Sequence, residues 1–502
     1  MRILFGLLSL RVRAHVILRG MAVFGMLLAF SPTFAHGQVS PSAPSPAGKP
    51  DRLPVTTSSP EAAKLFEEGL RFSYDFHVEQ ALGKLREATR KDPEFVQAWV
   101  YILRFTNDPV EAKQAAEKGQ FASQHVTPGE KLLVKWMVSR HDGRFVDAIA
   151  AMNDLLAMYP RDTDLNFGAA LWLLFSQGEY ELAAKFAKRT LEVDPNFVAA
   201  LNVMGYDLAA MHQYDEAISY LKRYAEAEPN DPNPRDSLGE ILREAGRLEE
   251  SQAEYREALK LNPKFYYSQL GIGDDYTLLG KQDRAREEYA KGPPTMAFAP
   301  QMGLKCRTQS AITYAREGDV QQARVQLAAV LEEATRLQVN NCRSLIHQDL
   351  ALLADSPAAA FQHLDQAEAV LQQPGPMAGG DRDVQLARIL RMRARLAAES
   401  GDLAMASAAV ARLYKMLQDT HSDAVERAYN GANGALLAAE SKIAAAIEAL
   451  QEDPEDPFSM AELAELQAAS GNTPAAEEIR ARLKADYSTA LEDWLVVRRF
   501  RP

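Results

Sequence analysis

A repeat of 34 residues constrains the fold of this chain more than any other feature. Pro195, Pro229 and Pro263 follow one another at intervals of 34 residues, and the glycines ten residues after each keep the same interval. Apolar residues at helical spacing fill the intervals, and no segment shows sustained strand alternation. A fixed period of about 20 to 50 residues indicates stacked supersecondary units. The sequence therefore predicts an all-α fold of repeated helix pairs.

The recurring residues resemble those of the tetratricopeptide repeat (TPR), a helix–turn–helix unit of about 34 residues. In that family a small residue on the first helix is followed twelve residues later by an alanine on the second helix, and after twelve more by a proline. One unit of this chain fits the pattern with Gly205, Ala217 and Pro229, and another with Gly69, Ala81 and Pro93. Small residues let two helices approach closely. We expect the proline to start the next helix, where its missing N–H has no cost.

The resemblance implies an all-α, right-handed superhelix, a solenoid of TPR and TPR-like helical hairpins. It is sharp in most of residues 61–292, where we expect a TPR array. It is weaker over 293–502, where we expect degenerate TPR-like hairpins, either continuing the array or forming a separate domain. A length of 502 residues alone suggests about three domains. The period replaces them with about a dozen hairpins stabilised by contacts between neighbours.

The N-terminal segment has the pattern of a secretory signal peptide, which we assign to residues 1–37. Arg11, Arg13 and Arg19 precede the apolar run Met21–Phe30, and small residues follow it, allowing cleavage after Ala35 or Gly37. We therefore expect an exported protein, periplasmic or secreted, with no membrane span once the signal is cleaved. The alternative is a retained N-terminal membrane anchor. Residues 38–60 are rich in Pro and Ser, and we expect a disordered linker there.

The charge balance argues against a nucleic-acid partner. The chain has 56 basic and 68 acidic residues, a formal net charge of −12. The signal segment contains four arginines and no acid, so the remainder has 52 basic against 68 acidic residues, or about −16. Non-specific binding to DNA or RNA requires a basic surface.

The sequence contains no cluster of residues typical of a catalytic site. The nine histidines are scattered without an HExxH spacing, the serines lack a GxSxG context, and no Walker loop is present. We expect no metal site, no cofactor and no enzymatic activity. The weakest alternative is an enzyme hidden in the degenerate half after Gly292.

The two cysteines, Cys306 and Cys342, are 36 residues apart, close to one repeat. This spacing places them at similar depths on the first helices of neighbouring hairpins. Exported proteins meet an oxidising environment, so we expect a disulfide between two hairpins. The alternative is a pair of buried free thiols, because a free cysteine behaves as a small hydrophobe.

The resemblance also implies a binding groove, because in TPR arrays the first helices of the hairpins line a concave surface that binds an extended peptide or a helix. Carrying over the groove positions of the family gives the candidate residues Trp172, Phe175, Asn202, Tyr206, Asp236, Glu240, Arg243, Tyr267 and Asp274. The family's clamp for a C-terminal carboxylate uses Lys, Arg and Asn, whereas several of these residues are aromatic or acidic. Such a groove suits a neutral or basic segment with apolar anchors. Alternatively, the aromatic residues pack between hairpins and the acids only keep the surface soluble.

Three functions are compatible with the sequence. The first is a non-enzymatic scaffold that binds a protein or peptide segment in the groove. The second is a structural or assembly subunit of a cell-envelope complex, held by its edges. The third is the hidden enzyme already named. Only the first explains the repeat, the signal and the missing chemistry together.

Overall fold

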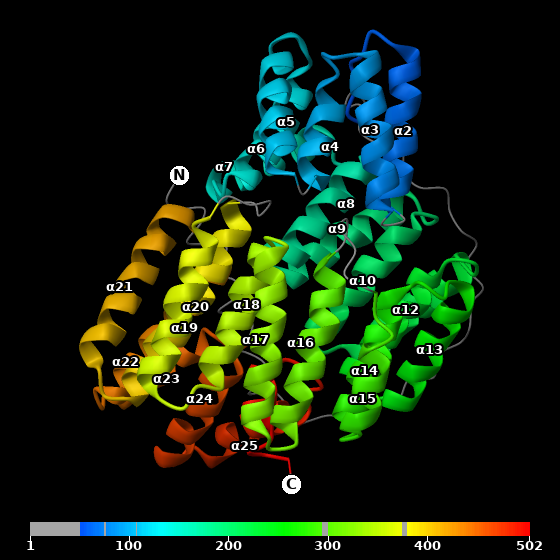
Figure 1. The fold of residues 1–502 in the computed structure, drawn as a ribbon. Helices are drawn as coiled ribbons and strands as arrows, with labels where there is room; N and C mark the ends of the chain where they lie inside the picture. Colours follow the sequence, from blue (N-terminus) through cyan, green and yellow to red (C-terminus); the bar gives the residue numbers. More distant parts are fainter. Residues whose placement is uncertain (1–50, 75–76, 107, 294–299, 374–378, 502) are drawn as a thin grey trace, which may run out of the picture. The chain divides into compact units, whose positions relative to one another are not determined.

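The fold was taken from a computed structural model, which describes residues 51–501 except 75–76, 107, 294–299 and 374–378. The predicted signal peptide and residues 38–50 of the predicted linker lie outside the described residues. Within the described part the chain forms twelve antiparallel helical hairpins followed by one short helix, and no strand (Figure 1). The all-α repeat predicted from the 34-residue period is confirmed.

The helices divide into two series. The first helices of the hairpins are α2 (Pro60–Tyr74), α4 (Val96–Phe105), α6 (Pro128–His141), α8 (Thr163–Trp172), α10 (Val198–Ala210), α12 (Pro232–Glu244), α14 (Tyr266–Leu278), α16 (Pro300–Arg316), α18 (Asn340–Leu352), α20 (Gly379–Glu399), α22 (Asp423–Ala439) and α24 (Pro457–Ala469). The second helices are α3 (Val78–Lys91), α5 (Pro109–Ala122), α7 (Phe145–Met158), α9 (Tyr180–Val193), α11 (Tyr214–Ala227), α13 (Leu248–Leu261), α15 (Gln282–Tyr289), α17 (Val320–Arg336), α19 (Pro357–Leu371), α21 (Leu403–Thr420), α23 (Ile443–Gln451) and α25 (Thr473–Lys484). A 3₁₀ turn, η1 (Ser123–His125), follows α5, a π-helical turn, η2 (Leu173–Gln177), extends α8, and α26 (Leu491–Val497) is the last described helix.

Glycine on a first helix is required where the second helix crosses it. A Cβ built on Gly205 would lie 2.6 Å from Cγ of Leu221 on α11. Ala217, at the start of α11, is fully buried. The recurrent Gly and Ala of the sequence pattern are therefore the residues that set the distance between the two helices of a hairpin.

The turn inside most of the described hairpins uses a left-handed residue. Gly178, Gly246 and Gly280 have φ values of 68°, 75° and 71°. His212 occupies the same place at φ 58°, in a unit whose turn has no glycine. Because glycine adopts this conformation at little cost, the turn glycines are a second signature of the period.

The recurrent prolines do not start helices, and this expectation was wrong. Pro195 lies in the turn after α9, three residues before α10 begins at Val198. The preceding residue, Asp194, has an extended backbone at φ −131° and ψ 95°. A residue before proline is driven out of the helical region, so the proline ends the second helix of its own unit.

The prediction of a disordered linker is also wrong for residues 51–59, because these residues pack against the repeats. Leu53 is buried, and its N–H donates to Oδ2 of Asp162 at 2.7 Å. The Thr56 N–H donates to Oε1 of Glu130 at 2.9 Å, and the Ser58 N–H donates to Oδ2 of Asp92 at 2.8 Å. We call this segment the N-terminal arm. Carboxylates of three hairpins hold its backbone, which a composition rich in Pro and Ser does not reveal.

The C-terminal residues do not complete a long hairpin. Degenerate hairpins were expected over the whole of 293–502, but α25 ends at Lys484 and only the short helix α26 follows, from Leu491. The six residues between them, 485–490, are non-helical, and we call them the C-terminal strap. In the described part of the chain, no helix is both long and apolar enough to cross a membrane.

Cys306 and Cys342 lie on α16 and α18 as expected, but both thiols are free, so the predicted disulfide is absent. Cys306 packs with Leu270 and Tyr289 of the preceding hairpin, whereas Cys342 packs against the core between α16 and α18. The two side chains therefore belong to different clusters. Burial raises the pKa of both thiols to about 11, which keeps them protonated.

Candidate functional site

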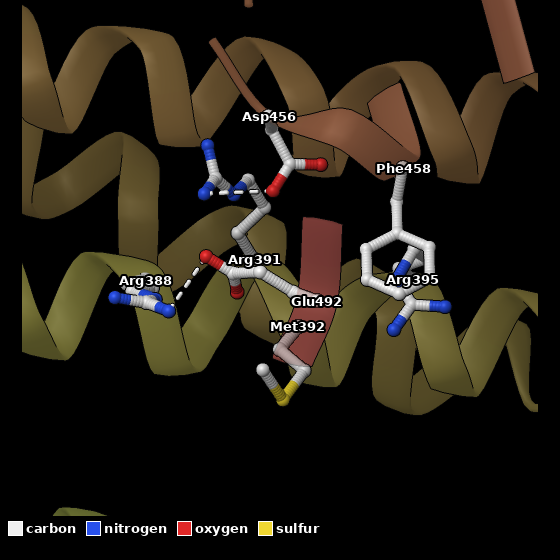
Figure 2. Close-up of a pocket in the computed structure, with 7 residues that line it drawn as sticks. All are labelled: Arg388, Arg391, Met392, Arg395, Asp456, Phe458 and Glu492. Carbon is white, nitrogen blue, oxygen red and sulfur yellow. Dashed lines mark hydrogen bonds and ion pairs between the residues drawn. The ribbon is translucent and has the colours of Figure 1, made fainter. Parts of the chain in front are cut away.

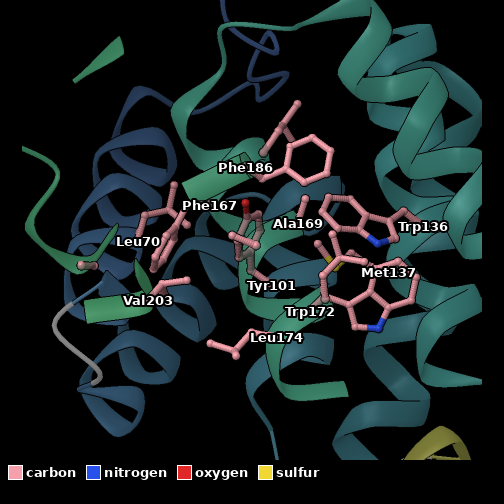
Figure 3. Packing of buried hydrophobic residues seen from close by; sticks show 14 of the residues in the cluster. Leu70, Tyr101, Trp136, Met137, Phe167, Ala169, Trp172, Leu174, Phe186 and Val203 are labelled. Carbon is pink, nitrogen blue, oxygen red and sulfur yellow. The ribbon is translucent and has the colours of Figure 1, made fainter. Parts of the chain in front are cut away.

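Two of the groove candidates are core residues. Trp172 is 1% exposed and lies beside Trp136, with ring centroids 6.1 Å apart (Figure 3). Asn202 is buried, and its Oδ1 has no hydrogen-bond partner among the described residues. The prediction that Trp172 faces a ligand is wrong, because the large first-helix residues of this unit fill the space between hairpins.

Three other candidates form a continuous row across neighbouring units. Phe175 is 64% exposed, on η2, and its ring lies 6.1 Å from that of Tyr206 on α10. The Tyr206 hydroxyl donates to Oε2 of Glu240 on α12 at 2.7 Å. The spacing of 34 residues between Tyr206 and Glu240 places them at equivalent positions of successive first helices. We call Phe175, Tyr206, Glu240 and their neighbours Arg243 and Asp274 the first-helix row.

Arg243 connects the row to the next unit. Its side chain is only 13% exposed, with Nη2 lying 3.5 Å from Oε1 of Glu240 and Nη1 lying 3.5 Å from Oδ2 of Asp274. Nη1 also donates to the Tyr255 hydroxyl at 3.0 Å. Asp274 receives a further hydrogen bond of 2.7 Å from the Tyr289 hydroxyl. One buried cation is therefore shared by two carboxylates from adjacent first helices, which fixes the row in place.

The last two candidates stand beside the row. Asp236 on α12 accepts a hydrogen bond of 2.6 Å from the Ser268 hydroxyl on α14. Burial raises the pKa of Asp236 to about 7, with Glu240 adding to the effect and Ser268 opposing it. Tyr267 is 61% exposed, and its ring lies 5.8 Å from that of Phe265. Among the described residues, no hydrogen bond or ring contact joins Tyr267 to the first-helix row.

The row has the chemistry of a hydrogen-bond acceptor beside an apolar anchor. Phe175 offers an exposed ring, and the half-buried Glu240 and Asp236 offer carboxyl oxygens. Burial raises the pKa of Asp274, against the opposing effects of Arg243 and Tyr289, and burial raises that of Glu244 to about 7. Near neutral pH the carboxyl groups of Asp236 and Glu244 are therefore only partly ionised. Such a surface accepts N–H groups and cations more readily than anions.

Several members of this network were missed from the sequence. Tyr255 and Tyr289 lie on second helices, where the family pattern expects packing residues, yet their hydroxyl groups contact Arg243 and Asp274. Their spacing of 34 residues was a usable signal, since tyrosine is the aromatic residue that carries a polar group into a core. Glu244, next to Arg243, was missed because adjacent residues of a helix point in different directions.

A second polar cluster lies on α20 and is occupied by the chain itself. Arg388 and Arg391 reach Glu492 and Asp456 at 2.6 and 2.8 Å, and the Arg395 guanidinium lies 3.7 Å from the centroid of the Phe458 ring (Figure 2). The space that these residues line has room for about one water molecule. The arginines therefore hold the C-terminal elements rather than a small-molecule ligand.

Metal-binding geometry is also missing from the part of the chain that the structure describes. No group of three or more His, Cys, Asp or Glu side chains there is arranged to hold a metal ion. His347 and His363 come within 3.3 Å through their Nδ1 atoms, but they form only a pair.

Comparison with known proteins identifies the repeat. Two family models described as tetratricopeptide repeat match the chain, one at residues 142–196 and the other at 174–241 and 208–271. The protein bimA of Emericella nidulans is 28% identical over 87 residues, which are 17% of this chain. This chain covers 11% of the length of that relative.

Solved structures with this kind of helical repeat are similar to larger parts of this chain, at low identity. A tetratricopeptide repeat protein from Parabacteroides merdae is 15% identical, with a TM-score of 0.35, covering 54% of this chain and 93% of that one. A thermophilic TPR protein of Thermus thermophilus is 22% identical, with a TM-score of 0.30, covering 35% and 95%. YrrB, described as a TPR protein with an unusual peptide-binding site, is 18% identical, with a TM-score of 0.26, covering 36% and 91%.

The family models cover the units that carry the first-helix row from Phe175 to Arg243. The sequence pattern, the twelve hairpins and these family matches agree. Residues 142–271 of this chain are therefore tetratricopeptide repeats, within a longer all-α array of helical hairpins.

Proposed function

We propose that this protein is a non-enzymatic scaffold that binds an extended segment of a protein partner along the first-helix row. The tetratricopeptide repeat supports protein–protein interaction as the general role. The row adds the chemistry of the partner, which carries an apolar side chain for the Phe175–Tyr206 pair and N–H groups or a cation for Glu240 and Asp236.

The exposed ring of Phe175 beside the Tyr206–Glu240 hydrogen bond carries this proposal. An isolated exposed phenylalanine is ordinary on a protein surface. Here the ring borders a polar row whose side chains are held by Arg243, so that little conformational freedom is lost when a partner binds. Aromatic anchors next to fixed polar groups are typical of the residues that dominate binding energy.

The proposed location is outside the cytoplasm, in the periplasm or beyond. This part rests on the basic residues, the apolar run Met21–Phe30 and the small residues that follow it. The net charge of about −16 after cleavage, from 52 basic and 68 acidic residues, suits a protein that does not bind nucleic acid.

Site-specific photo-crosslinking in cells tests the proposed binding surface. A photoreactive phenylalanine analogue replaces Phe175 in one full-length variant and Phe121 on α5 in a control variant. The two native side chains are matched, at 64% and 65% exposed. We expect position 175 to link to a discrete segment of one protein, which mass spectrometry of the crosslinked peptides identifies, while position 121 does not.

Two outcomes would count against the proposal. Equal crosslinking from both positions, or crosslinking from position 121 alone, would favour a structural subunit that is held by other surfaces. The same mass-spectrometric experiment defines the partner segment, so its charge and its apolar residues can be compared with those expected.

A further inference from the structure

The C-terminal strap lies across the ends of first helices that are distant in sequence. A Cβ built on Gly246, in the turn after α12, would lie 2.6 Å from the Tyr487 ring, so the ring packs directly on this turn. The Arg316 Nη2, at the end of α16, donates to the carbonyl oxygen of Thr489 at 3.1 Å. The strap is therefore an extended segment in contact with two hairpins that precede it by more than 170 residues.

Both basic and acidic groups surround the carboxyl group of Asp486 in the strap. His212, in the turn after α10, Arg316 and Arg501 interact favourably with the Asp486 carboxylate. Glu244 and Asp493 oppose it. Asp486 itself is half-buried, and burial raises its pKa. The guanidinium groups of Arg316 on α16 and Arg501 after α26 thus lie near this carboxyl group, and His212 adds to them only when protonated, which burial disfavours by lowering its pKa.

The strap and α26 are attached very differently. Leu491, Val496 and Val497 of α26 are buried, and Glu492 pairs with Arg388 at 2.6 Å. Within the strap only Thr489 is buried. A segment opens locally at the lowest cost in free energy where it buries few apolar groups. The strap therefore relies mainly on polar contacts, including the hydrogen bond from Ser488 Oγ to Oδ2 of Asp493 and that from Arg501 to the Asp486 carbonyl oxygen, and it should open more readily than α26.

We propose that the turns after α10 and α12, with the C-terminal end of α16, form a second binding surface, whose resident ligand is the C-terminal strap. The partner that fits it is an extended protein segment with an acidic residue next to an aromatic ring, followed by small residues. This inference goes beyond the proposed function, because the surface lies at helix ends and selects the opposite charge from the first-helix row. An external segment must compete with the strap, whose tether gives it an effective concentration of about 1 mM.

Binding of the strap sequence in trans tests the proposal on the full-length chain. The probe is a fluorescent synthetic peptide of residues 484–490, measured by anisotropy against the wild type and the double variant Asp486→Ala, Tyr487→Ala. We expect saturable binding to the double variant, about tenfold tighter than to the wild type, because the competitor is weakened. Adding Arg316→Gln to the double variant should weaken binding of the peptide again. A peptide with alanine in place of its tyrosine is the matched control and should not bind.

Equal binding to wild type and double variant, or no binding to either, would overturn the proposal. Hydrogen exchange of the unmodified chain gives a second measurement that does not depend on the variants' folding. The amides of Tyr487 and Ser488 should exchange at least about tenfold faster than those in the last turn of α26. If strap and helix exchange at one common rate, the strap is a fixed part of the fold and the surface is not available.

Discussion

At the scale of single residues, the sequence revealed which positions must be small but not which must be buried and polar. Gly205 could be predicted as a contact because it recurs with Gly239 at the period. The burial of Trp172 could not, since the same position faces a groove in one arrangement and a neighbouring hairpin in another. Which occurs depends on the side chains opposite, here Trp136 and Phe145.

The role of the small residues gives a prediction for Gly205→Ala. The new Cβ would lie 2.6 Å from Cγ and 2.7 Å from Cδ2 of Leu221, so we expect the free energy of unfolding to fall by about 1–3 kcal/mol. The matched control is Gly83→Ala on α3, where a Cβ would meet nothing within 4 Å. That change should raise stability by about 0.5–1 kcal/mol, because glycine weakens a helix interior. Urea unfolding of both variants measures the difference, and similar losses in both would refute the packing role.

At the scale of elements, the hairpins could be predicted because their signals are local and repeated. The N-terminal arm and the C-terminal strap could not, since neither has a period and both are held by side chains far away in sequence. Leu53, for example, bonds to Asp162, and Thr489 bonds to Arg316. The absence of the disulfide could not be predicted either. The repeat spacing of the cysteines determines on which helices they lie, but not the direction of their side chains.

The docking of α24 on α20 gives the second prediction. Arg391 reaches Asp453 at 2.9 Å and Asp456 at 2.8 Å, and both carboxylates are almost fully buried. Arg391→Leu leaves them without their cation, so we expect a loss of about 3–5 kcal/mol in unfolding free energy. Arg412→Leu is the control, since Arg412 pairs with Glu368 at the surface and should cost less than about 1 kcal/mol. Thermal and urea unfolding measure the stability of both variants. Equal losses in the two would contradict the role of Arg391 in docking α24 on α20.

At the scale of the whole described chain, contacts between distant hairpins add to those between neighbours. The Tyr180 hydroxyl at the start of α9 donates to Oε1 of Glu455 at 3.2 Å. A Cβ built on Gly178 would lie 2.5 Å from Nη2 of Arg427 on α22. A solenoid held only by contacts between neighbouring hairpins needs neither of these two long-range contacts. A period in the sequence predicts neighbour contacts alone, which is why these were not foreseen.

The contact between α9 and α22 should depend on pH. A hydrogen bond with Asp423, together with burial, raises the pKa of Glu179 to about 8 from an ordinary value near 4.5. The contact therefore takes up a proton, so its stability is greatest below about pH 4.5 and is lost progressively as pH rises through 8. Hydrogen exchange at the start of α22 should quicken over this range in the wild type. In Glu179→Gln the exchange rate at the start of α22, corrected for the intrinsic rate, should not change with pH. If the pH dependence persists in this variant, groups other than Glu179 cause it.

The central claim is that a partner segment binds along the first-helix row, and one affinity comparison tests it most directly. The segment identified by crosslinking is titrated calorimetrically into the wild type, Phe175→Ala and Phe121→Ala. The account predicts a dissociation constant about tenfold or more weaker for Phe175→Ala, which corresponds to about 1.4 kcal/mol, and a change of less than about twofold for Phe121→Ala. Unchanged affinity in Phe175→Ala, or equal losses in the two variants, would contradict it.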